Sequence, residues 1–371
     1  MSDTPKKPYY TLSNDDLWFL ETLINTPSPT GFEARGQRVW IDRIRPHVDT
    51  VSVDTYWTAV ATINPDHDYS VVIEAHCDEI TWFVNYIADN WIIHVTRNWW
   101  ADHMVAPWMR VVIEGKQWDV AGVFWRPAIH TRKEKDTLKL KPETIFVDIW
   151  ASSCEEVEEL WVVVWSVIRY DEKFTILNKN YYTWRAFDNR AGWFMIAQVA
   201  KMIKASWKQL PFRLDIVNSV QEEIWLRWAQ MISRRLAPDV AIITDVCHDT
   251  STPHIDQKIE GKSVCGGWPV LTVWPAVHNA LRDRIEKVAL EHSIPFQRMA
   301  ASYYTGTDTD AFAYSSTGVP SALVSLPLKY MHTPVETVHH DDIANTVWLL
   351  YEMVCSITPW DQFHYFPELT Y

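Results

Sequence analysis

Glycine is scarce in this chain of 371 residues, which has 10 glycines and 22 tryptophans. At average usage, a chain of this length holds roughly 26 glycines. The deficit of glycine is thus matched by an excess of tryptophan. The composition is otherwise that of a globular protein, because 47% of the residues are hydrophobic and 22% are charged. These proportions exclude a disordered chain.

Long hydrophobic runs, a signal core, a basic excess and closely spaced cysteines are also missing. Without a long apolar run, no segment is predicted to cross a bilayer, and the start "MSDTPKKPYYTLSNDDL" has no apolar core that would indicate export. The 5 cysteines are odd in number and widely spaced, which predicts reduced thiols in the cytoplasm. The net charge of -13 argues against nucleic acid or an anionic membrane as a partner.

The length predicts a core domain and a second module. Near the start, Ser13 and Asp16 form the pattern of a capping box and predict a helix over 14–25. The prolines of "TPSPTGFE" end this helix. A second helix is predicted over 36–48, followed by strands within 51–63.

The pattern changes between about residues 84 and 168, where short β-branched runs such as "MRVVIEG" and "TIFVDI" are separated by turns. This pattern predicts a small β-rich module inserted into the chain. From residue 185 onward helices and strands alternate, which indicates an α/β layer fold. The predicted domains are therefore a discontinuous α/β domain, 1–83 with 169–371, and an inserted domain, 84–168. The charged tract 131–141 is expected to face solvent.

Four apolar runs end on residue types that bind metals. "VVIEAH" ends at His76, "LDIVNSVQEE" at Glu222 and Glu223, "VAIITD" at Asp245, and "ALVSLPLKYMH" at His332. Asp188 in "RAFDNRAG", next to a predicted helix, is a fifth candidate. Ligands gather at the carboxyl ends of the strands in open α/β sheets, so we expect these side chains to converge on one site.

The residue types indicate the metal and the roles. Two imidazoles with several carboxylates suit zinc, cobalt or manganese, and one aspartate can bridge two ions about 3.5–4 Å apart. In extended backbone, successive side chains point to opposite sides. One of Glu222 and Glu223 is therefore expected to bind metal, and the other to act as a general base. Asp78 is expected to accept the second imidazole N–H of His76.

Each of these features has a simpler explanation when it is taken alone. Paired glutamates are usually solvent-exposed, a histidine after a strand is usually structural, and Asp245 fits a helix N-cap. His339 and His340 fit the start of a helix, with the following aspartates at its positive end. The metal-site interpretation depends on the occurrence of all five candidates at strand or helix ends.

Six motifs together resemble the glutamyl and leucyl aminopeptidases that assemble as tetrahedral (TET) particles, a metallopeptidase family. They are "SPTGFE", "EAHCDEI", "RAFDNRAG", "SVQEEI", "ITDV" and "YMHTPVETV", and they follow the family's order over essentially the whole chain. The resemblance implies that His76 and Asp245 bind one metal ion and that Glu223 and His332 bind the other. Asp188 would bridge the two ions.

The same resemblance implies Glu222 as the general base and Asp78 as the residue that orients His76. Asp308, in "YYTGTDTDAFAYSSTGVP", would help to hold the free amine of the substrate. The implied fold is a mixed-sheet α/β catalytic domain of the zinc-exopeptidase type with an inserted small β-barrel dimerisation domain. Dimers of this kind build a twelve-subunit hollow shell.

The expected function is release of N-terminal residues from peptides with two divalent ions per subunit, zinc or cobalt. Three alternatives stay open. One is a different metal-dependent amide hydrolase, such as a deacylase or a carboxypeptidase. Another is a glycosidase, because paired carboxylates also cleave sugars. The third is an inactive metal-binding subunit of an assembly.

The family also implies glycine at positions where this chain has tryptophan. These positions are Trp57, Trp99, Trp100, Trp125, Trp150, Trp165, Trp184, Trp193, Trp225 and Trp228. A positive φ costs a residue with a Cβ roughly 1–2 kcal/mol, and overpacking a core costs typically 1–3 kcal/mol. We therefore expect backbone or packing strain at these sites.

Overall fold

The computed structural model describes residues 10–132, 140–302 and 304–366, and the chain forms two compact units. The first unit comprises Met1–Asp78, Phe174–Met331 and Glu336–Tyr371. The second unit comprises Glu79–Lys173 and the short segment His332–Val335. Residues 133–139 of the charged tract lie outside the described residues.

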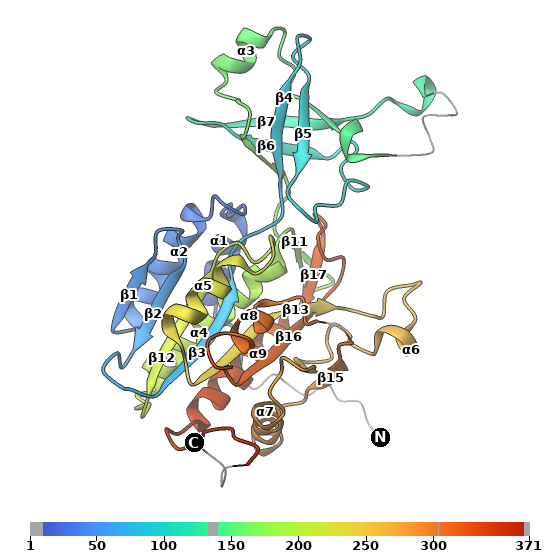
Figure 1. Ribbon diagram of the computed structural model, residues 1–371. Helices are drawn as coiled ribbons and strands as arrows, with labels where there is room; N and C mark the ends of the chain where they lie inside the picture. Colours follow the sequence, from blue (N-terminus) through green and yellow to red (C-terminus); the bar gives the residue numbers. More distant parts are fainter. Residues whose placement is uncertain (1–9, 133–139, 303, 367–371) are drawn as a thin grey trace. The chain divides into compact units, whose positions relative to one another are not determined.

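The first unit contains both helices and strands (Figure 1). They are α1 Asn14–Asn25, α2 Ala34–Ile44, η1 Arg45–His47, β1 Thr50–Val53, β2 Ala59–Ile63, β3 Ser70–His76, β10 Thr175–Leu177, β11 Tyr181–Trp184, α4 Phe187–Ser206, β12 Arg213–Ser219, α5 Arg227–Leu236, β13 Val240–His248, α6 Gln257–Glu260, β14 Val270–Val273, α7 Asn279–Glu291, β15 Gln297–Ala300, α8 Asp308–Ala313, β16 Ser321–Leu328, β17 Glu336–His339 and α9 His340–Ser356. Within the described ranges, no helix has the length and apolar character that a membrane span requires.

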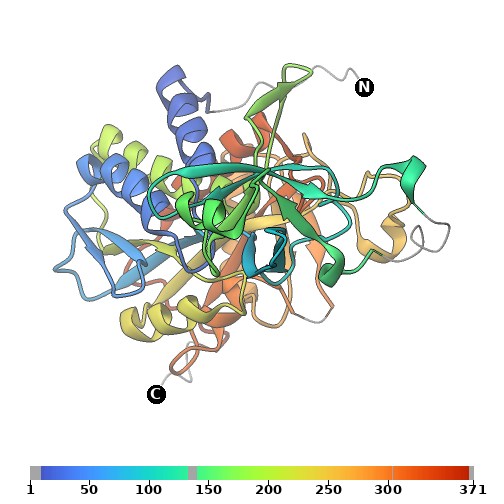
Figure 2. The same ribbon diagram turned by 90° about the horizontal axis from the view of Figure 1, so that it is seen from above.

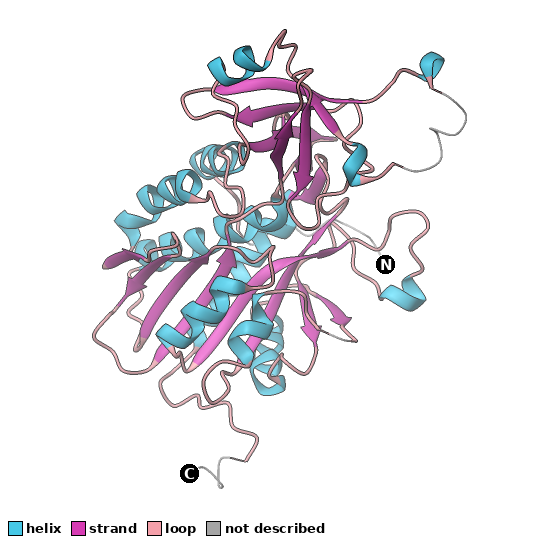
Figure 3. Ribbon diagram, turned by 45° about the horizontal axis from the view of Figure 1, so that its top comes forward, coloured by secondary structure: helices cyan, strands magenta, loops and turns pink. Residues whose placement is uncertain are grey.

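An eight-stranded mixed sheet organises the first unit, with the strand order β1-β2-β12-β3-β13-β16-β14-β15. Figure 3 shows strands in magenta and helices in cyan. The four central strands β12, β3, β13 and β16 run parallel, whereas β1, β2 and the β14–β16 pairing are antiparallel. A separate three-stranded sheet has the order β10-β11-β17. The expected mixed-sheet α/β fold is confirmed.

Alternate residues of the central strands pack on opposite faces of the sheet. In β3, Val71 and Ile73 belong to the core cluster that includes α1, α2, α4 and α9, whereas Val72 packs with residues of α5 and α8. This alternation follows from the two-residue period of a strand. α1 and α2, blue in Figure 2, lie beside α4. Covered on both faces, the central strands are apolar almost throughout.

Local sequence signals account for two of the helix starts. Ser13 caps α1 and forms a capping box with Asp16, so the predicted helix over 14–25 is confirmed. His339 is the N-cap of α9 and accepts a hydrogen bond from the amide of Asp341, which confirms the helix start predicted there. The helix predicted over 36–48 begins earlier, at Ala34, and ends at Ile44, where the 3-10 turn η1 follows.

The second unit is built around a closed six-stranded barrel of order β4-β5-β8-β7-β6-β9. Its elements are β4 Trp82–Ile87, β5 Ile93–Arg97, β6 Arg110–Glu114, β7 Asp119–Trp125, η2 Ile129–Thr131, η4 Pro142–Thr144, β8 Phe146–Asp148, α3 Cys154–Glu159 and β9 Val167–Tyr170. Trp82, Phe124 and other buried side chains fill its interior. Closure leaves no unpaired strand edge in this sheet.

Many tryptophans have a backbone conformation that favours glycine. The tryptophans with positive φ are Trp57, Trp91, Trp99, Trp108, Trp150, Trp161, Trp165, Trp207, Trp225 and Trp268. Five of the positions where the family implied glycine are among them. The other five are not, and two of those, Trp184 and Trp193, are buried in the core. A positive φ costs such a residue about 1–2 kcal/mol, so the left-handed tryptophans strain the backbone.

Replacing Trp207 by glycine is expected to stabilise the protein by about 1 kcal/mol. Trp207 is the C-cap of α4 with φ 55°, and its side chain is 82% exposed, so the replacement relieves strain and removes little packing. The matched control is Trp18→Gly, because Trp18 is 63% exposed inside α1. Glycine there is expected to destabilise by about 0.5 kcal/mol. Urea denaturation measures the free energy of unfolding of both variants. An equal loss of stability in the two variants would contradict backbone strain at Trp207.

Candidate metal centre and active site

The carboxyl ends of parallel strands bring the candidate residues to one edge of the sheet. His76 is the last residue of β3 and pairs in register with Ser219, the last residue of β12. The β13–β3 register includes Ile243 opposite Glu74, so Asp245 follows two residues beyond this pair. Asp188 lies in the first turn of α4, which packs against both β3 and β13. The predicted convergence of these residues therefore follows from the sheet register.

His76 is surrounded by carboxylates. Its Nε2 atom lies 3.2 Å from Asp188 Oδ1, 3.7 Å from Asp245 Oδ1 and 3.8 Å from Glu222 Oε2. Its Nδ1 atom lies 3.4 Å from Asp78 Oδ1. The five side chains are at most 10% exposed. One imidazole thus meets four acidic groups in a nearly dry site.

The electrostatics of this group fit a bound cation. Burial raises the pKa of Glu222 well above its ordinary value, and the neighbouring carboxylates of Asp245 and Asp308 add to the rise, although His76 opposes it. Burial likewise raises the pKa of Asp245. In the described part of the chain, no lysine or arginine forms an ion pair with Glu222 or Asp245. Buried carboxylates without such a partner either take up a proton or bind another positive charge, and a metal ion would supply that charge.

Two sets of atoms around Asp188 could hold ions. His76, Asp188 and Asp245 each offer a ligand atom, and these atoms lie within 4.8 Å of one another. Asp188 and Glu223 also bring carboxylate oxygens within 4.8 Å of each other, so Asp188 belongs to both sets. An imidazole with carboxylates is a donor set that zinc and cobalt accept. His332 directly follows Met331 in the turn between β16 and β17.

Asp78 holds the paired glutamates as well as facing His76. Its carboxylate accepts hydrogen bonds from the backbone amides of Glu222, at 3.0 Å, and Glu223, at 3.2 Å, and from Thr30 Oγ1, at 2.9 Å. The pair lies in the connection between β12 and α5, after Gln221 with φ 60°, and a turn begins at Glu223. Glu222 reaches toward His76, while Glu223 lies beside Asp188.

Sequence reasoning missed several buried polar residues around the site. Thr30 binds Asp78, and Glu33, which is fully buried, accepts a hydrogen bond from the amide of Gly31 at 2.7 Å. Burial, together with Asp78, raises the pKa of Glu33 to about 8. Glu74 and Ser219 lie on the strands that carry the site and contact each other. The signal for Glu74 was an acid inside the apolar run "VVIEAH".

Asp245 and Asp308 occupy different kinds of backbone. Asp245 lies inside β13, so it is not a helix N-cap, and its Oδ1 accepts the amide of Val246 at 2.8 Å. Asp308 is the first residue of α8, is 1% exposed, and accepts a hydrogen bond from Ser219 Oγ at 2.8 Å. Asp308 therefore connects to the strand end that pairs with His76.

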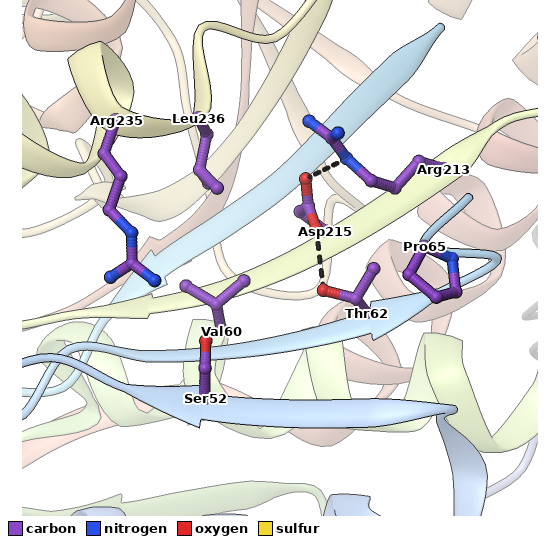
Figure 4. A pocket seen from close by; sticks show the side chains of 8 residues that line it. All are labelled: Ser52, Val60, Thr62, Pro65, Arg213, Asp215, Arg235 and Leu236. Carbon is purple, nitrogen blue, oxygen red and sulfur yellow. Dashed lines mark hydrogen bonds and ion pairs between the residues drawn. The ribbon is translucent and has the colours of Figure 1, made fainter. Parts of the chain in front are cut away.

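A pocket elsewhere in the first unit contains none of these residues (Figure 4). It is lined by Ser52, Val60, Thr62, Pro65, Arg213, Asp215, Arg235 and Leu236. Asp215 accepts hydrogen bonds from Thr62 Oγ1, at 2.8 Å, and from Arg213 Nε, at 2.9 Å. Arg213 is the first residue of β12. The pocket thus lies at the opposite end of this strand from the candidate site.

Known proteins resemble this chain over nearly its full length. The lysyl aminopeptidase of Pyrococcus furiosus is 29% identical over 351 residues, which cover 93% of this chain and 99% of that protein. The TET aminopeptidase of a marine-sediment thaumarchaeon is 25% identical, with a TM-score of 0.87 over 93% of this chain and 97% of that one. An aminopeptidase from Desulfurococcus kamchatkensis, also 25% identical, has a TM-score of 0.85 over 93% and 96%.

The sequence profile of the M42 glutamyl aminopeptidase family matches residues 58–349. The fold, the acidic site and this match define a peptidase that depends on a divalent metal ion. The chain belongs to the M42 glutamyl aminopeptidase family and is a metal-dependent aminopeptidase. The suspected resemblance to TET aminopeptidases is confirmed.

Proposed function

We propose that this aminopeptidase releases N-terminal residues from peptides with two divalent ions, zinc or cobalt, in each subunit. His76 and Asp245 would hold one ion, and Glu223 and His332 would hold the other. Asp188 would contact both ions. The observation that carries the proposal is the surrounding of His76 by Asp188, Asp245 and Glu222 within 3.8 Å. The carboxylates and the ions together would come close to neutrality, which lowers the cost of burying them.

When bound, the ions polarise the carbonyl oxygen of the scissile bond and lower the pKa of water. Glu222 takes a proton from the attacking water and delivers it to the leaving amine, as a general base and then a general acid. Its carboxylate lies 3.8 Å from His76 Nε2, beside the residues proposed to hold the ions, where it can reach a water molecule bound there. Asp78 fixes the position of Glu222 through the backbone amide and faces Nδ1 of His76.

A panel of fluorogenic amino-acyl substrates tests this function, with N-acetylated twins as controls and with a chelator. We expect release from free-amine substrates alone, its loss on removal of metal, and its recovery with added zinc or cobalt. Release from the acetylated twins would indicate a deacylase, and indifference to the chelator would contradict the metal mechanism. Metal bound without any turnover would leave an inactive assembly subunit as the explanation.

We also propose that the chain self-associates through its inserted barrel domain into dimers and then into a dodecamer. The likeness to a TET aminopeptidase supports this proposal. The Pyrococcus horikoshii TET1 peptidase, which shares the fold with a TM-score of 0.81 and is 22% identical, can assemble into a tetrahedron or a large octahedral shell. Sedimentation velocity separates monomer, dimer and dodecamer directly.

A cytoplasmic location is part of the same proposal. All five cysteines are free thiols, and Cys77 and Cys247 are buried. Free thiols fit a reducing compartment, where disulfides are rare. Fractionation of the cells that make the protein tests this location.

A further inference from the structure

Three buried polar side chains form a connected group next to the candidate site. Ser219 Oγ contacts Glu74 Oε1 and lies 2.8 Å from Asp308 Oδ2. Glu74 and Ser219 are completely buried, and Asp308 is 1% exposed. Glu74 precedes His76 by two residues in β3, so both side chains point to the same face of the sheet. The group therefore faces the space that His76 faces.

This group has acceptor atoms to spare. Among the described residues, Glu74 Oε2 and Asp308 Oδ1 are buried and have no hydrogen-bond partner. Leaving a buried acceptor without a donor is costly. An ammonium group carries three N–H donors and a positive charge, so it can satisfy a carboxylate of this kind. A peptide's free N-terminus is such a group.

We propose that Glu74 and Ser219 are positioning residues that hold Asp308 to receive the N-terminal ammonium of the substrate. The inference deepens the proposed function and depends on it. Ser219 has a single hydroxyl proton and sits between the two carboxyl groups, so it links β3 to the start of α8. Without this link, Asp308 is free to turn away from the amine.

Binding is the readout, because it does not require turnover. Calorimetry on metal-loaded protein would compare leucine and lysine with their desamino twins in Asp308→Asn, Ser219→Ala and Glu74→Gln. We expect the wild type to prefer the amino acid, Asp308→Asn to lose at least tenfold of that preference, and the other two variants to lose part of it. Ser321→Ala is the matched control, since Ser321 is buried at the amino end of β16 and binds Val319.

An unchanged preference in Ser219→Ala would overturn the positioning role. Because this variant removes a single hydroxyl group, it tests the role even if Glu74→Gln does not fold. An unchanged preference in Asp308→Asn would overturn the ammonium site. The proposed function fails separately, through turnover that does not depend on metal. A wild type that binds both twins equally would also overturn the inference.

A second inference comes from the left-handed tryptophans. Ten of the 22 tryptophans have a positive φ, although only a few per cent of non-glycine residues adopt it. Asparagine and aspartate reach this region through local hydrogen bonds, whereas a bulky aromatic residue has no such help. Eight of the ten side chains are 37% to 82% exposed, so burial of the indole does not explain them.

The positions themselves are those that depend on glycine. Trp207 ends α4 as its C-cap, and Trp57 lies in the turn between β1 and β2. Trp225 has φ 80° and lies two residues after Glu223. Left-handed residues at helix ends and tight turns are usually glycine. Trp40 contrasts with them, because it is fully buried in α2 and its Nε1 donates to the carbonyl of Trp193.

We infer that the functional protein carries glycine at the ten left-handed tryptophan positions. The codon UGA provides a route, because some bacteria read it as tryptophan and others read it as glycine. The gene would then have UGA at these ten codons and UGG at Trp40. The ten changes would leave 12 tryptophans and 20 glycines, which brings the glycine content closer to the roughly 26 of average usage.

Peptide mass spectrometry of the protein from the cells that make it tests the inference directly. Peptides that cover Trp207 and Trp225 are expected to be lighter, by the difference between an indolylmethyl group and a hydrogen at each site. Tryptophan masses there, or UGG codons at the ten positions, would overturn it. Recombinant protein with all ten glycines should also melt at a higher temperature than the tryptophan form, and an equal or lower melting temperature would contradict the structural argument.

Discussion

Glu222→Gln is expected to lower kcat by about 10²- to 10⁴-fold, the usual contribution of a general base. The amide keeps the size of the side chain and cannot take a proton. The Glu222 carboxylate lies 3.8 Å from His76 Nε2, and its side chain is 10% exposed. Glu222 is therefore next to the proposed ions, but it belongs to neither of the two ligand sets that include Asp188. The bound metal should therefore stay near the wild-type amount. Stopped assays with a fluorogenic substrate and elemental analysis of the same sample measure both quantities.

Glu291→Gln is the matched control, because this substitution replaces the same carboxylate by an amide at an exposed helix end. Glu291 pairs there with Lys287. Its kcat should equal that of the wild type. If Glu222→Gln kept full turnover, another residue would have to move the proton. A parallel loss of metal would instead assign Glu222 to the ligands.

Asp188→Ala is expected to abolish measurable turnover and to reduce metal affinity. Loss of a residue that only supports a metal ligand lowers affinity roughly 10–100-fold, and the loss of Asp188 itself should lower it further. Asp188 lies 3.2 Å from His76 Nε2 and shares the second set with Glu223. Its removal thus takes a ligand from both proposed ions. Its backbone amide donates to Glu336, a bond that alanine retains. Equilibrium dialysis with zinc measures the affinity of each site.

Asp283→Ala provides the control, since the Asp283 side chain is 64% exposed and pairs with the adjacent Arg282. Circular dichroism of both variants separates loss of metal from loss of fold. Asp188→Ala protein that still bound two ions with wild-type affinity would remove Asp188 from the bridging role. Loss of one ion alone would assign it to a single site.

Short-range signals explain why part of the fold was predictable. The capping box at Ser13 and Asp16 uses neighbours three residues apart, and α1 begins where it predicts. The runs that end at His76 and contain Asp245 are buried strands, because continuous apolar sequence suits a sheet covered on both faces. The ligand candidates were recognisable, since metals select residue types and parallel strands gather their ends.

Contacts between distant segments were beyond such reasoning. The sequence predicted that Asp78 orients His76, yet Asp78 also binds the amides of Glu222 and Glu223, which lie more than 140 residues away. The pair follows the left-handed Gln221, and a turn begins at Glu223. A turn of this kind depends on the partner that holds it, and that partner is not local.

The sequence by itself determined the residue types of the site, the α/β alternation and the β-rich insertion, because period and composition act over a few residues. The tertiary structure alone decided the strand order, the register that sets Ser219 beside His76, and the contacts of Ser219 with Glu74 and Asp308. It also decided which tryptophans have a left-handed backbone. Register and φ are set by packing across the whole sheet and at each turn, and no single segment carries that information.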